Sequence, residues 1–445
     1  MTTKIPRLAS TVRVDPRRDL RGRLLPPSSK YHTLRFLLAA FLAHGESVVL
    51  YPAESDDTSV LLEACRALGA QIEELERQQG RPVLRVWGTG GVLSQPPGGQ
   101  LNVGNAGAVA RLLLGICALV RGTITLTTPY AQSLGRRPNA DLLAALAQLG
   151  VEARGTTPEG TLPLTLCADR LHGGTVTISG RQSSQYLSAL LFLGPLLPEG
   201  LSIEVTDGLT SASFIDLTLT ILAGAGITIH TLEQYRRYRI PGGQRYRAGV
   251  STVPGDYPSA AALLGAVAIA GGAITIENLA ADDAAGAAVL EAFAALGLDI
   301  SRQGQDLQVR RQRPLQGLHL DGSRVIDSVP VIAAAACFAR TPSRIYNVAN
   351  LHLKESDRIE DLAAELRKLG CQIRPLPDAL DIQPVAAGAI GGGVEVQAHA
   401  DHRLIQALTI AGLGCREPIT LCGAKHIAKS YPRFFDDLAL LYAGE

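Results

Sequence analysis

The 445-residue sequence predicts an α/β protein made of six similar units. The main observation is an internal repeat, in which an amphipathic helix, a glycine and a strand recur along the chain. The length is enough for two or three ordinary domains, and the hydrophobic content of 46% is typical of globular proteins. Six units divide naturally into two groups of three.

The clearest copy of the repeat is the segment LLEACRALGAQI at residues 61–72. Glycines that are expected to end the repeated helices stand at positions 69, 150, 226, 297 and 370, so the steps are 71 to 81 residues long. Units of that length hold several strands and helices, which excludes a short-repeat solenoid. A last helix at residues 434–441 is expected to close a sixth unit. The other copies are residues 142–153, 289–300, 362–373 and, in degenerate form, 217–229.

Composition and charge exclude several classes of protein. Forty-two Lys and Arg residues against 41 Asp and Glu leave a net charge of +1, so bulk charge does not favour a nucleic-acid partner. The seven cysteines are scattered and show no Cys-x-x-Cys or Cys/His ligand spacing. They predict reduced thiols in a cytosol, with neither disulfides nor a metal site.

Hydrophobic patterning predicts a protein that does not bind a membrane. The N-terminus has no apolar stretch of the kind found in secretory signals. The longest apolar run, residues 260–276, is interrupted by Gly265, Gly271 and Gly272. We expect a buried helix followed by a strand there, and a soluble, cytoplasmic protein.

Chemistry is expected where polar residues interrupt the repeats. Lys30 and Arg35 precede or enter an apolar helix, whose unpaired N–H groups favour anions. Gly107 lies in the loop LNVGNAGAVAR, which leads into a helix at 109–119 and lets backbone amides approach a phosphate. This loop matches neither a dinucleotide fingerprint nor a P-loop.

Two further segments allow two interpretations each. Ser183, Ser184 and Gln185 precede a buried helix, where they are expected either to cap the helix or to bind a phosphate. Asp327 precedes an apolar helix at 331–339 and can serve as a cap or as a general base.

Charged residues also stand ahead of helices near the C-terminus. Residues 353–358, LKESDR, precede a periodic helix at 359–369. An exposed run of charged residues is usually only a solvated face of a helix. A functional interpretation of this cluster therefore depends on the other polar segments of the chain. Those segments include Asp401-His402-Arg403 and Lys429-Ser430-Tyr431-Pro432, of which the first again precedes an apolar helix.

Together these motifs resemble those of the 5-enolpyruvylshikimate-3-phosphate synthase family of enolpyruvyl transferases, from about residue 24 to residue 441. The resemblance implies a two-lobed fold of six βαβαββ-type repeats, three per lobe, with buried helices and outer sheets. It implies one lobe at 29–253, mainly acceptor-binding, and another formed by 1–28 with 254–445, with the site between them. The motifs, in chain order, are Ser29-Lys30 with Arg35, Gly104-Asn105-Ala106-Gly107, Arg137-Pro138, Gly180 with Ser183-Ser184-Gln185, Pro254-Gly255-Asp256, Asp327, Lys354 to Arg358, Asp401-His402-Arg403 and Lys429 to Pro432.

The resemblance also implies the reaction: transfer of the enolpyruvyl group of phosphoenolpyruvate to the 5-hydroxyl of shikimate 3-phosphate, with release of phosphate. Several arginines suit two phosphorylated carboxylates, because the guanidinium fork meets such anions in two bonds. The residues implied for phosphoenolpyruvate are Lys30, Gly107, Arg137, Gln185, Arg358, Arg403 and Lys429. Those implied for shikimate 3-phosphate are Lys30, Tyr31, Arg35, Ser183, Ser184, Gln185, Ser211, Asp327, Asn350 and Lys354.

For the chemical step, the resemblance implies Asp327 as the base that deprotonates the hydroxyl and Glu355 as the acid that protonates the methylene carbon. Nearby cations disfavour the protonated form of such a carboxyl, so Lys30 or Lys429 is an alternative proton carrier. Several cations can stabilise the developing charge directly, and no metal or other cofactor is expected. The family resemblance favours a monomer.

Three positions depart from the family pattern. The family usually has Ser at the position of Tyr31, Thr at that of Ala108 and often Tyr at that of Phe214. A paralogue that uses another phosphorylated cyclic alcohol therefore stays open, as does a non-catalytic ligand-binding protein on the same scaffold. The sister enzyme acting on UDP-N-acetylglucosamine fits less well, because residues 131–137 lack the Cys of its loop.

Overall fold

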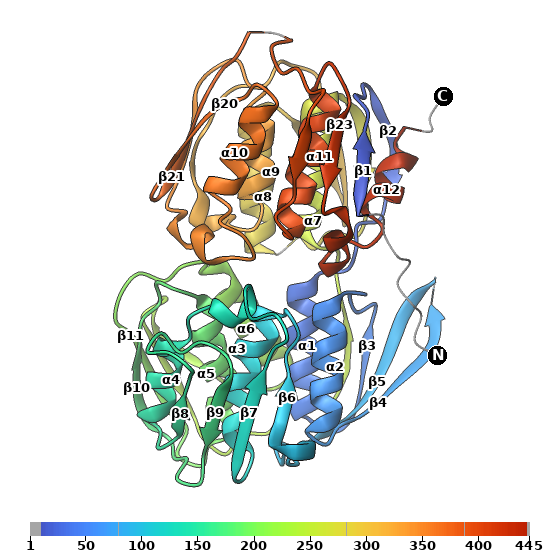
Figure 1. The fold of residues 1–445 in the computed structure, drawn as a ribbon. Helices are drawn as coiled ribbons and strands as arrows, with labels where there is room; N and C mark the ends of the chain where they lie inside the picture. The colour runs from blue at the N-terminus through green and yellow to red at the C-terminus, as the bar shows by residue number, and fades with distance from the viewer. Residues whose placement is uncertain (1–9, 79, 282, 387, 443–445) are drawn as a thin grey trace. The chain divides into compact units, whose positions relative to one another are not determined.

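The computed structural model describes residues 10–442 except 79, 282 and 387. Contacts divide the chain into two compact units, one of Met1–Pro27 with Pro254–Glu445 and one of Ser28–Val253. The described residues form six sheets, three in each unit. The α/β class with outer sheets and inner helices is therefore confirmed (Figure 1).

The unit Ser28–Val253 holds three repeats, two of them continuous. The first repeat takes its outermost strand from the C-terminal end of the unit, where β14 (Val250–Thr252) lies parallel to β3 (His44–Leu50). The first repeat consists of α1 (Lys30–Leu42), β3 (His44–Leu50), α2 (Asp56–Ala67), β4 (Gln71–Gln78), β5 (Arg81–Thr89) and β14 (Val250–Thr252). The second consists of β6 (Gln100–Asn102), α3 (Gly107–Ile116), β7 (Thr123–Thr127), α4 (Ala140–Ala147), β8 (Glu152–Arg154) and β9 (Leu164–Cys167). The third consists of β10 (Gly174–Ile178), α5 (Ser184–Leu193), β11 (Leu201–Val205), α6 (Ser213–Gly224), β12 (His230–Glu233) and β13 (Arg237–Ile240).

The other unit has the same plan, and two of its sheets take a strand from the N-terminal segment. Its first repeat consists of β2 (Leu20–Leu24), α7 (Tyr257–Ala270), β15 (Gly272–Ile276), α8 (Ala284–Leu296), β16 (Asp299–Gln303) and β17 (Asp306–Arg311). The second consists of β18 (His319–Asp321), α9 (Val329–Ala336), β19 (Ser343–Tyr346), α10 (Glu360–Lys368), β20 (Gln372–Leu376) and β21 (Ala379–Gln383). The last consists of β22 (Glu395–Gln397), α11 (His402–Gly414), β23 (Ile419–Cys422), α12 (Phe434–Leu440) and β1 (Thr11–Val14).

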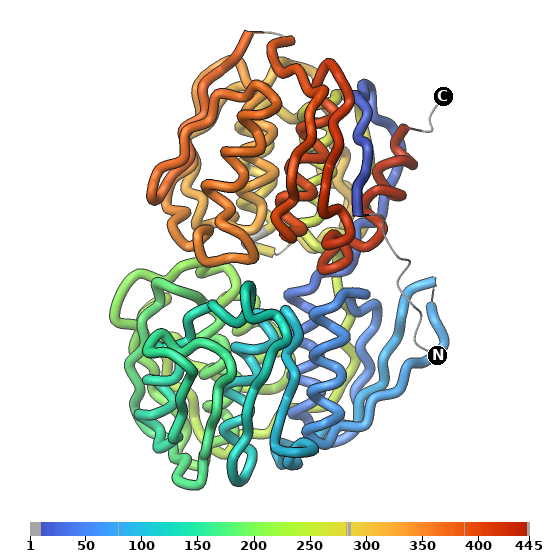
Figure 2. The backbone as a smooth tube through the Cα atoms, viewed as in Figure 1, coloured from blue at the N-terminus to red at the C-terminus, as the bar shows by residue number. Residues whose placement is uncertain are grey.

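Each four-stranded sheet combines one parallel pair with antiparallel neighbours. In the sheet of order β6-β7-β9-β8, Leu101 pairs with Leu126 in parallel and Ile124 with Leu166 antiparallel. The sixth sheet has three strands, and β1 pairs antiparallel with β23, so that Val12 faces Leu421. Figure 2 shows this N-terminal strand beside the C-terminal one. The sixth repeat is therefore completed by a strand from the start of the chain.

Helix ends follow the glycine signals. All five repeat glycines have positive φ, between 79° and 113°, which side chains disfavour and glycine tolerates. The apolar run 260–276 divides as predicted, because α7 ends at Ala270 and Gly271 and Gly272 turn the chain into β15. Within the described residues, no helix is long and apolar enough to cross a membrane.

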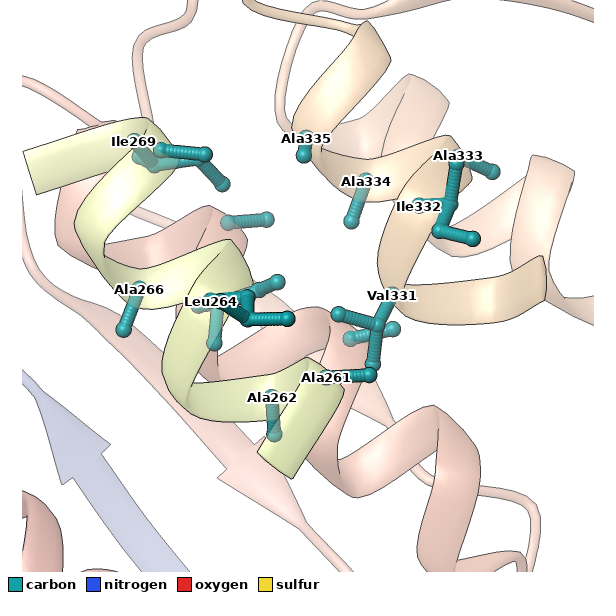
Figure 3. Packing of buried hydrophobic residues seen from close by; sticks show 14 of the residues in the cluster. Ala261, Ala262, Leu264, Ala266, Ile269, Val331, Ile332, Ala333, Ala334 and Ala335 are labelled. Atoms are coloured by element: carbon teal, nitrogen blue, oxygen red, sulfur yellow. The ribbon is translucent and has the colours of Figure 1, made fainter. Parts of the chain in front are cut away.

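The inner helices of each unit pack closely through small residues. Almost every residue of α7, α9 and α11 is buried, and the facing sides of α7 and α9 carry alanines between larger side chains (Figure 3). A Cβ at Gly265 would lie 2.5 Å from Cδ1 of Ile410 and 2.8 Å from Cγ1 of Val331. Because cores are densely packed, a larger residue at position 265 would push these helices apart.

Candidate active site

Most of the predicted site residues lie in the first turns of helices or shortly before them. In the unit Ser28–Val253 they form what we call the helix-end cluster, which is described first. Unpaired amides and the helix dipole make such ends favourable for anions. The helix-end cluster consists of Lys30, Tyr31, Arg35, Gly107, Arg111, Arg137, Ser183, Ser184, Gln185 and Ser211.

Lys30 is the first residue of α1 and is almost fully buried. The helix begins there because the Ser29 hydroxyl accepts a hydrogen bond from the amide of His32. The Lys30 ammonium lies 3.0 Å from a carboxylate oxygen of Asp57, and the side chains of Lys30 and Asp57 are only 10% and 3% exposed. The buried carboxylate fixes the position of this ammonium.

Arg35 lies one turn further along α1 and is buried. Its Nε donates to the Thr218 hydroxyl at 2.8 Å, and its terminal nitrogens donate to the carbonyls of Tyr31 and Phe214. Burial lowers the pKa of Arg35 to about 10, and the nearby Tyr31 opposes this only in part. The hydroxyl and the two carbonyls that Arg35 contacts are neutral, so a carboxylate that bound here would pair with a strongly desolvated cation.

Gly107 is the first residue of α3. The helix therefore begins two residues earlier than the sequence pattern predicted. A Cβ at this position would lie 2.6 Å from a terminal nitrogen of Arg137. Any side chain at position 107 would therefore displace the guanidinium of Arg137. The absence of a Cβ lets the cation and the helix amides approach the same space.

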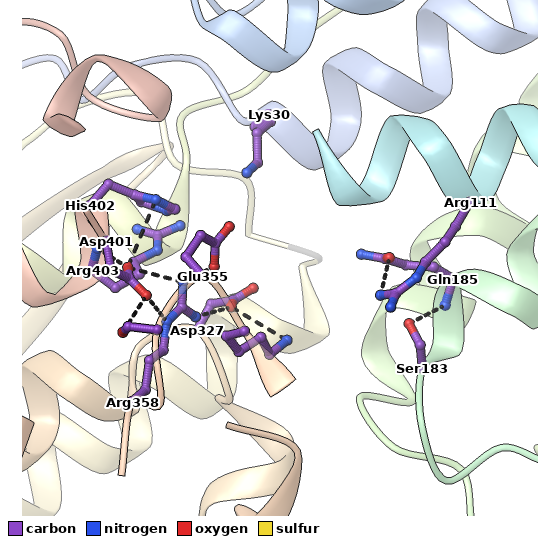
Figure 4. A network of polar contacts seen from close by, with 12 residues as sticks. Lys30, Arg111, Ser183, Gln185, Asp327, Glu355, Arg358, Asp401, His402 and Arg403 are labelled. Atoms are coloured by element: carbon purple, nitrogen blue, oxygen red, sulfur yellow. Dashed lines mark hydrogen bonds and ion pairs between the residues drawn. The ribbon is translucent and has the colours of Figure 1, made fainter. Parts of the chain in front are cut away.

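Arg111 and Gln185 join α3 to the start of α5. Arg111 donates to the Gln185 side-chain oxygen at 3.1 Å and also bonds Asn139 and the Pro138 carbonyl. The Ser183 hydroxyl accepts from the Gln185 amide at 3.3 Å, so Ser183 is the N-cap (Figure 4). The capping interpretation of Ser183 is correct, and it leaves the hydroxyl proton available to a ligand.

Ser184 and Ser211 complete the helix-end cluster. Ser184 is buried in the first turn of α5. Ser211 is buried just before α6 and has a φ of 57°, an uncommon value for a residue with a side chain. Such a conformation is kept where the surroundings determine it, which is common in ligand-binding segments.

The other unit carries what we call the carboxylate cluster: Asp327, Glu355 and Asp401 around Arg358, with Lys354, Arg403 and Lys429. Arg358 is 1% exposed. It donates to Asp401 from Nε at 2.8 Å, to Asp327 at 3.0 Å and to Glu355 at 2.7 Å (Figure 4). A single guanidinium thus holds three carboxylates from three helix starts.

The electrostatics of this arrangement favour the charged arginine. Burial by itself would lower the pKa of Arg358, but the three carboxylates outweigh it and hold that pKa well above its usual value. Removing Arg358 would leave the fully buried Asp401 carboxylate without its guanidinium partner, and breaking a buried ion pair in this way typically costs about 3–5 kcal/mol. Arg358 therefore has a structural role in this cluster.

Two lysines contact the carboxylates. Lys429 Nζ lies 2.7 Å from Glu355 Oε1, and Lys354 Nζ lies 3.9 Å from Asp327 Oδ1.

Asp327 does not cap α9, whose N-cap is Ser328. The capping alternative for Asp327 is therefore wrong, since its carboxylate faces Arg358 and Lys354.

Asp401 and Arg403 stand at the start of α11. The fully buried Asp401 carboxylate accepts from the Arg403 amide at 2.8 Å and from the Ser356 hydroxyl at 3.1 Å. Arg403 donates to Gln406, while its buried Nε has no hydrogen-bond partner among the described residues. The buried side-chain oxygen of Asn350 likewise has none there. Both groups are suited to a polar ligand.

The structure adds positions that the sequence interpretation did not assign. Asp57, Arg111 and Asp401 each orient a predicted residue. Asp401 had a visible signal, since an Asp directly before an apolar helix is a typical N-cap. Asp57 and Arg111 had none, because their partners lie 27 and 74 residues away in the sequence.

Each cluster has a chemistry of its own. The helix-end cluster offers buried cations, hydroxyls and helix amides, which suits phosphate and carboxylate groups. The carboxylate cluster places Lys429 at hydrogen-bond distance from Glu355, an arrangement that suits proton transfer beside an anionic substrate.

Comparison with solved structures places the fold in a known class. EPSP synthase from Acinetobacter baumannii matches with a TM-score of 0.81 and 24% identity, over 97% of this chain and 98% of that one. The enolpyruvyl transferase NikO from Streptomyces tendae matches with a TM-score of 0.73 and 18% identity, over 96% of both chains. The protein has the two-lobed enolpyruvyl transferase fold.

Sequence comparison identifies the family within this fold class. The profile of the family described as EPSP synthase (3-phosphoshikimate 1-carboxyvinyltransferase) matches residues 14–438. The 3-phosphoshikimate 1-carboxyvinyltransferase of Deinococcus radiodurans is 43% identical over 97% of this chain and 95% of its own length. That of Methanocaldococcus jannaschii is 34% identical over 95% and 96%. The chain belongs to the EPSP synthase family.

Proposed function

We propose that this chain transfers the enolpyruvyl group of phosphoenolpyruvate to the 5-hydroxyl of shikimate 3-phosphate and releases phosphate. This reaction belongs to the shikimate pathway, which leads to chorismate and the aromatic amino acids. The observation that carries the proposal is the family match over nearly the whole chain. The contact of Arg358 with both Asp327 and Glu355 supports it, since these carboxylates are the proposed base and acid.

Phosphoenolpyruvate carries a phosphate and a carboxylate and therefore needs several cations. We assign Arg358, Arg403 and Lys429 of the carboxylate cluster to it, because they surround the proposed acid and base. From the helix-end cluster, Lys30, Gly107, Arg137 and Gln185 are assigned to the same substrate. The approach of Arg137 to the Cα of Gly107 supports a phosphate position at the start of α3.

Shikimate 3-phosphate is assigned mainly to the helix-end cluster. Ser183, Ser184 and Ser211 offer hydroxyls to its phosphate, and the buried Arg35 offers a desolvated cation to its carboxylate. Tyr31, Gln185 and Lys30 complete that part of the assignment. From the carboxylate cluster and its surroundings, Asp327, Asn350 and Lys354 are assigned to the same substrate, with Asp327 next to the reacting hydroxyl.

The chemical step follows from these assignments. As the 5-hydroxyl oxygen bonds to C2 of phosphoenolpyruvate, its proton passes to Asp327 and the methylene carbon gains a proton. The resulting adduct then loses phosphate from C2 and a proton from the methyl group, which restores the double bond. Two cations lie 2.7 Å from Glu355, so the proton passes through the Glu355 and Lys429 pair, with Lys30 as a further carrier.

A second candidate is transfer to a different phosphorylated cyclic alcohol. The ring contact of Tyr31 with Phe214 favours it, because it places an aromatic pair next to Arg35, the cation proposed for the acceptor. A non-catalytic ligand-binding protein is a weaker alternative, since both proposed catalytic carboxylates are present and ion-paired.

We also propose a cytoplasmic monomer that binds neither nucleic acid nor membrane. A net charge of +1 and the family resemblance support this proposal. Light scattering coupled to size-exclusion chromatography tests it: a mass near 46.9 kDa is expected, and about twice that mass would contradict it.

Phosphate release tests the proposed function. The purified protein is given phosphoenolpyruvate with shikimate 3-phosphate, with unphosphorylated shikimate, or with no acceptor. We expect release that depends on shikimate 3-phosphate. Binding of phosphoenolpyruvate without release would favour a different acceptor, and release without an acceptor would indicate hydrolysis.

A further inference from the structure

A strained turn directly precedes the residues that organise the carboxylate cluster. Residues 398–401 form a β-turn in which the Asp401 amide donates to the Ala398 carbonyl at 2.9 Å. The two central residues, His399 and Ala400, have φ values of 49° and 55°. Positive φ at both central positions defines a type I′ turn, for which Asn-Gly is the preferred sequence.

Neither His399 nor Ala400 is the Asn or Gly that this turn prefers, and Ala400 is a poor residue for it. Left-handed backbone is uncommon for residues with a side chain, and His adopts it more often than Ala does. Such a conformation persists only where the surrounding structure determines it, so other contacts must hold the turn. Those contacts lie on both sides of it.

On one side, the His399 ring is held by helix α10. Its Nε2 lies 3.0 Å from Glu365 Oε1, and its Nδ1 lies 3.6 Å from Asp361 Oδ1. Glu365 is 3% exposed and also accepts from the Gln397 amide at 2.9 Å and from Lys368 at 2.7 Å. A buried carboxylate thus anchors both the imidazole and the end of β22, from which the turn begins.

On the other side, Asp401 binds Arg358, Ser356 and the amide of Arg403. Only Ala400 separates His399 from Asp401. The same helix that holds His399, α10, follows directly after Arg358 in the chain. The strained turn is therefore held on both sides by residues of one segment, 356–365: His399 contacts Glu365, and Asp401 contacts Ser356 and Arg358.

We propose that His399 is a positioning residue that, through this turn, sets Asp401 and hence Arg358 and Arg403 for the anionic donor substrate. This inference rests on the proposed function, in which Arg358 and Arg403 bind phosphoenolpyruvate. His399 itself touches no substrate. Its contact with Glu365 keeps the turn in the left-handed form, and relaxation of the turn would move the Asp401 carboxylate.

The test compares three variants with the wild-type protein. His399→Ala removes the contact of the turn itself with Glu365 and leaves both central residues of the turn unfavourable for it. The double variant His399→Asn, Ala400→Gly also removes the contact but supplies the residues that favour this turn. His319→Ala, an exposed imidazole on β18 of the same unit, serves as the control.

We expect His399→Ala to raise the KM for phosphoenolpyruvate about tenfold while the KM for shikimate 3-phosphate changes less than about twofold. The double variant should return the phosphoenolpyruvate KM to within about twofold of wild type. A general loss of folding would instead lower the active fraction without a selective change in one KM.

Two outcomes would overturn the proposal. One is an unchanged phosphoenolpyruvate KM in His399→Ala, and the other is a double variant as impaired as the single one. Failure of the proposed function itself is seen separately, because the wild-type protein would then show no phosphate release that depends on shikimate 3-phosphate.

Discussion

The ring of Tyr31 at the start of α1 packs on the ring of Phe214 in the first turn of α6, with centroids 4.4 Å apart and planes inclined by 37°. Both residues also offer their backbone carbonyls to Arg35. Two of the three positions that depart from the family pattern are thus in direct contact. They form one structural element beside a cation that we assign to the acceptor.

This contact predicts energetic coupling between Tyr31 and Phe214. Tyr31→Ala and Phe214→Ala should each lower kcat/KM for shikimate 3-phosphate, and the double variant should lose less than the sum. Aromatic pairs of this kind contribute about 0.5–1.5 kcal/mol beyond burial, so the coupling should lie in that range. A cycle of Tyr31→Ala with Trp87→Ala, whose ring packs with Arg85, should be additive. Additivity in the first cycle would show that the rings act independently.

Asp327→Asn should lower kcat at least about 100-fold, because an amide cannot accept the hydroxyl proton. The KM values should change less than about threefold, since Arg358 keeps its bonds to Asp401 and Glu355. Steady-state kinetics with both substrates varied checks this. Asp381→Asn, which removes a carboxylate on β21 that pairs with Arg344 of β19, is the control. Wild-type turnover in Asp327→Asn would exclude Asp327 as the base.

Gly107→Ala should raise the KM for phosphoenolpyruvate by about tenfold with a folded protein, since the new methyl group meets the flexible end of Arg137 at 2.6 Å. Gly224→Ala in α6 is a matched control, because a Cβ there meets no atom within 4 Å. Circular dichroism verifies folding of both variants. An unchanged KM in Gly107→Ala would remove position 107 from the phosphate assignment.

Stability should depend on pH through Glu365. Burial by itself would raise the pKa of the Glu365 carboxyl. Hydrogen bonds from Lys368, the Gln397 amide and His399 outweigh burial, so the pKa lies below its usual value. A depressed carboxyl pKa stabilises the fold above the unfolded-state pKa, and this contribution is lost as pH falls. Glu365→Gln should therefore be less stable than wild type at pH 7, by about 2 kcal/mol.

That difference should shrink as pH falls below about 4.3, the ordinary pKa of a glutamate, and through the lower pKa that Glu365 has in the folded protein. Calorimetric melting temperatures of both proteins over this range provide the measurement. A constant difference from pH 7 to pH 3 would contradict the depressed pKa of Glu365.

The repeats made the fold predictable, because helix periodicity and cap glycines are local signals. The glycines at 69, 150, 226, 297 and 370 each have the left-handed backbone that a helix end requires. Strand exchange was not predictable in the same way. β1 and β2 complete sheets whose other strands lie more than 240 residues away, and short strands carry no signal of their partner.

The positions of candidate site residues were predictable where a polar residue stands at or just before a helix start, as with Lys30, Asp327 and Arg358. Their supporting contacts were not. Asp57 binds Lys30, and Asp401 binds Arg358 from 43 residues away, and such pairings depend on tertiary packing. Helix starts also shifted by up to two residues, because Ser183 caps α5 and Gly107 enters α3.

The most direct measurement follows phosphoenolpyruvate labelled with ¹³C at its methylene carbon by NMR, with shikimate 3-phosphate present. We predict that the label appears in an enolpyruvyl ether on the 5-oxygen, with one inorganic phosphate released for each ether formed. Label that appears only in pyruvate, or that stays in phosphoenolpyruvate while the protein binds both compounds, would contradict the proposed transfer.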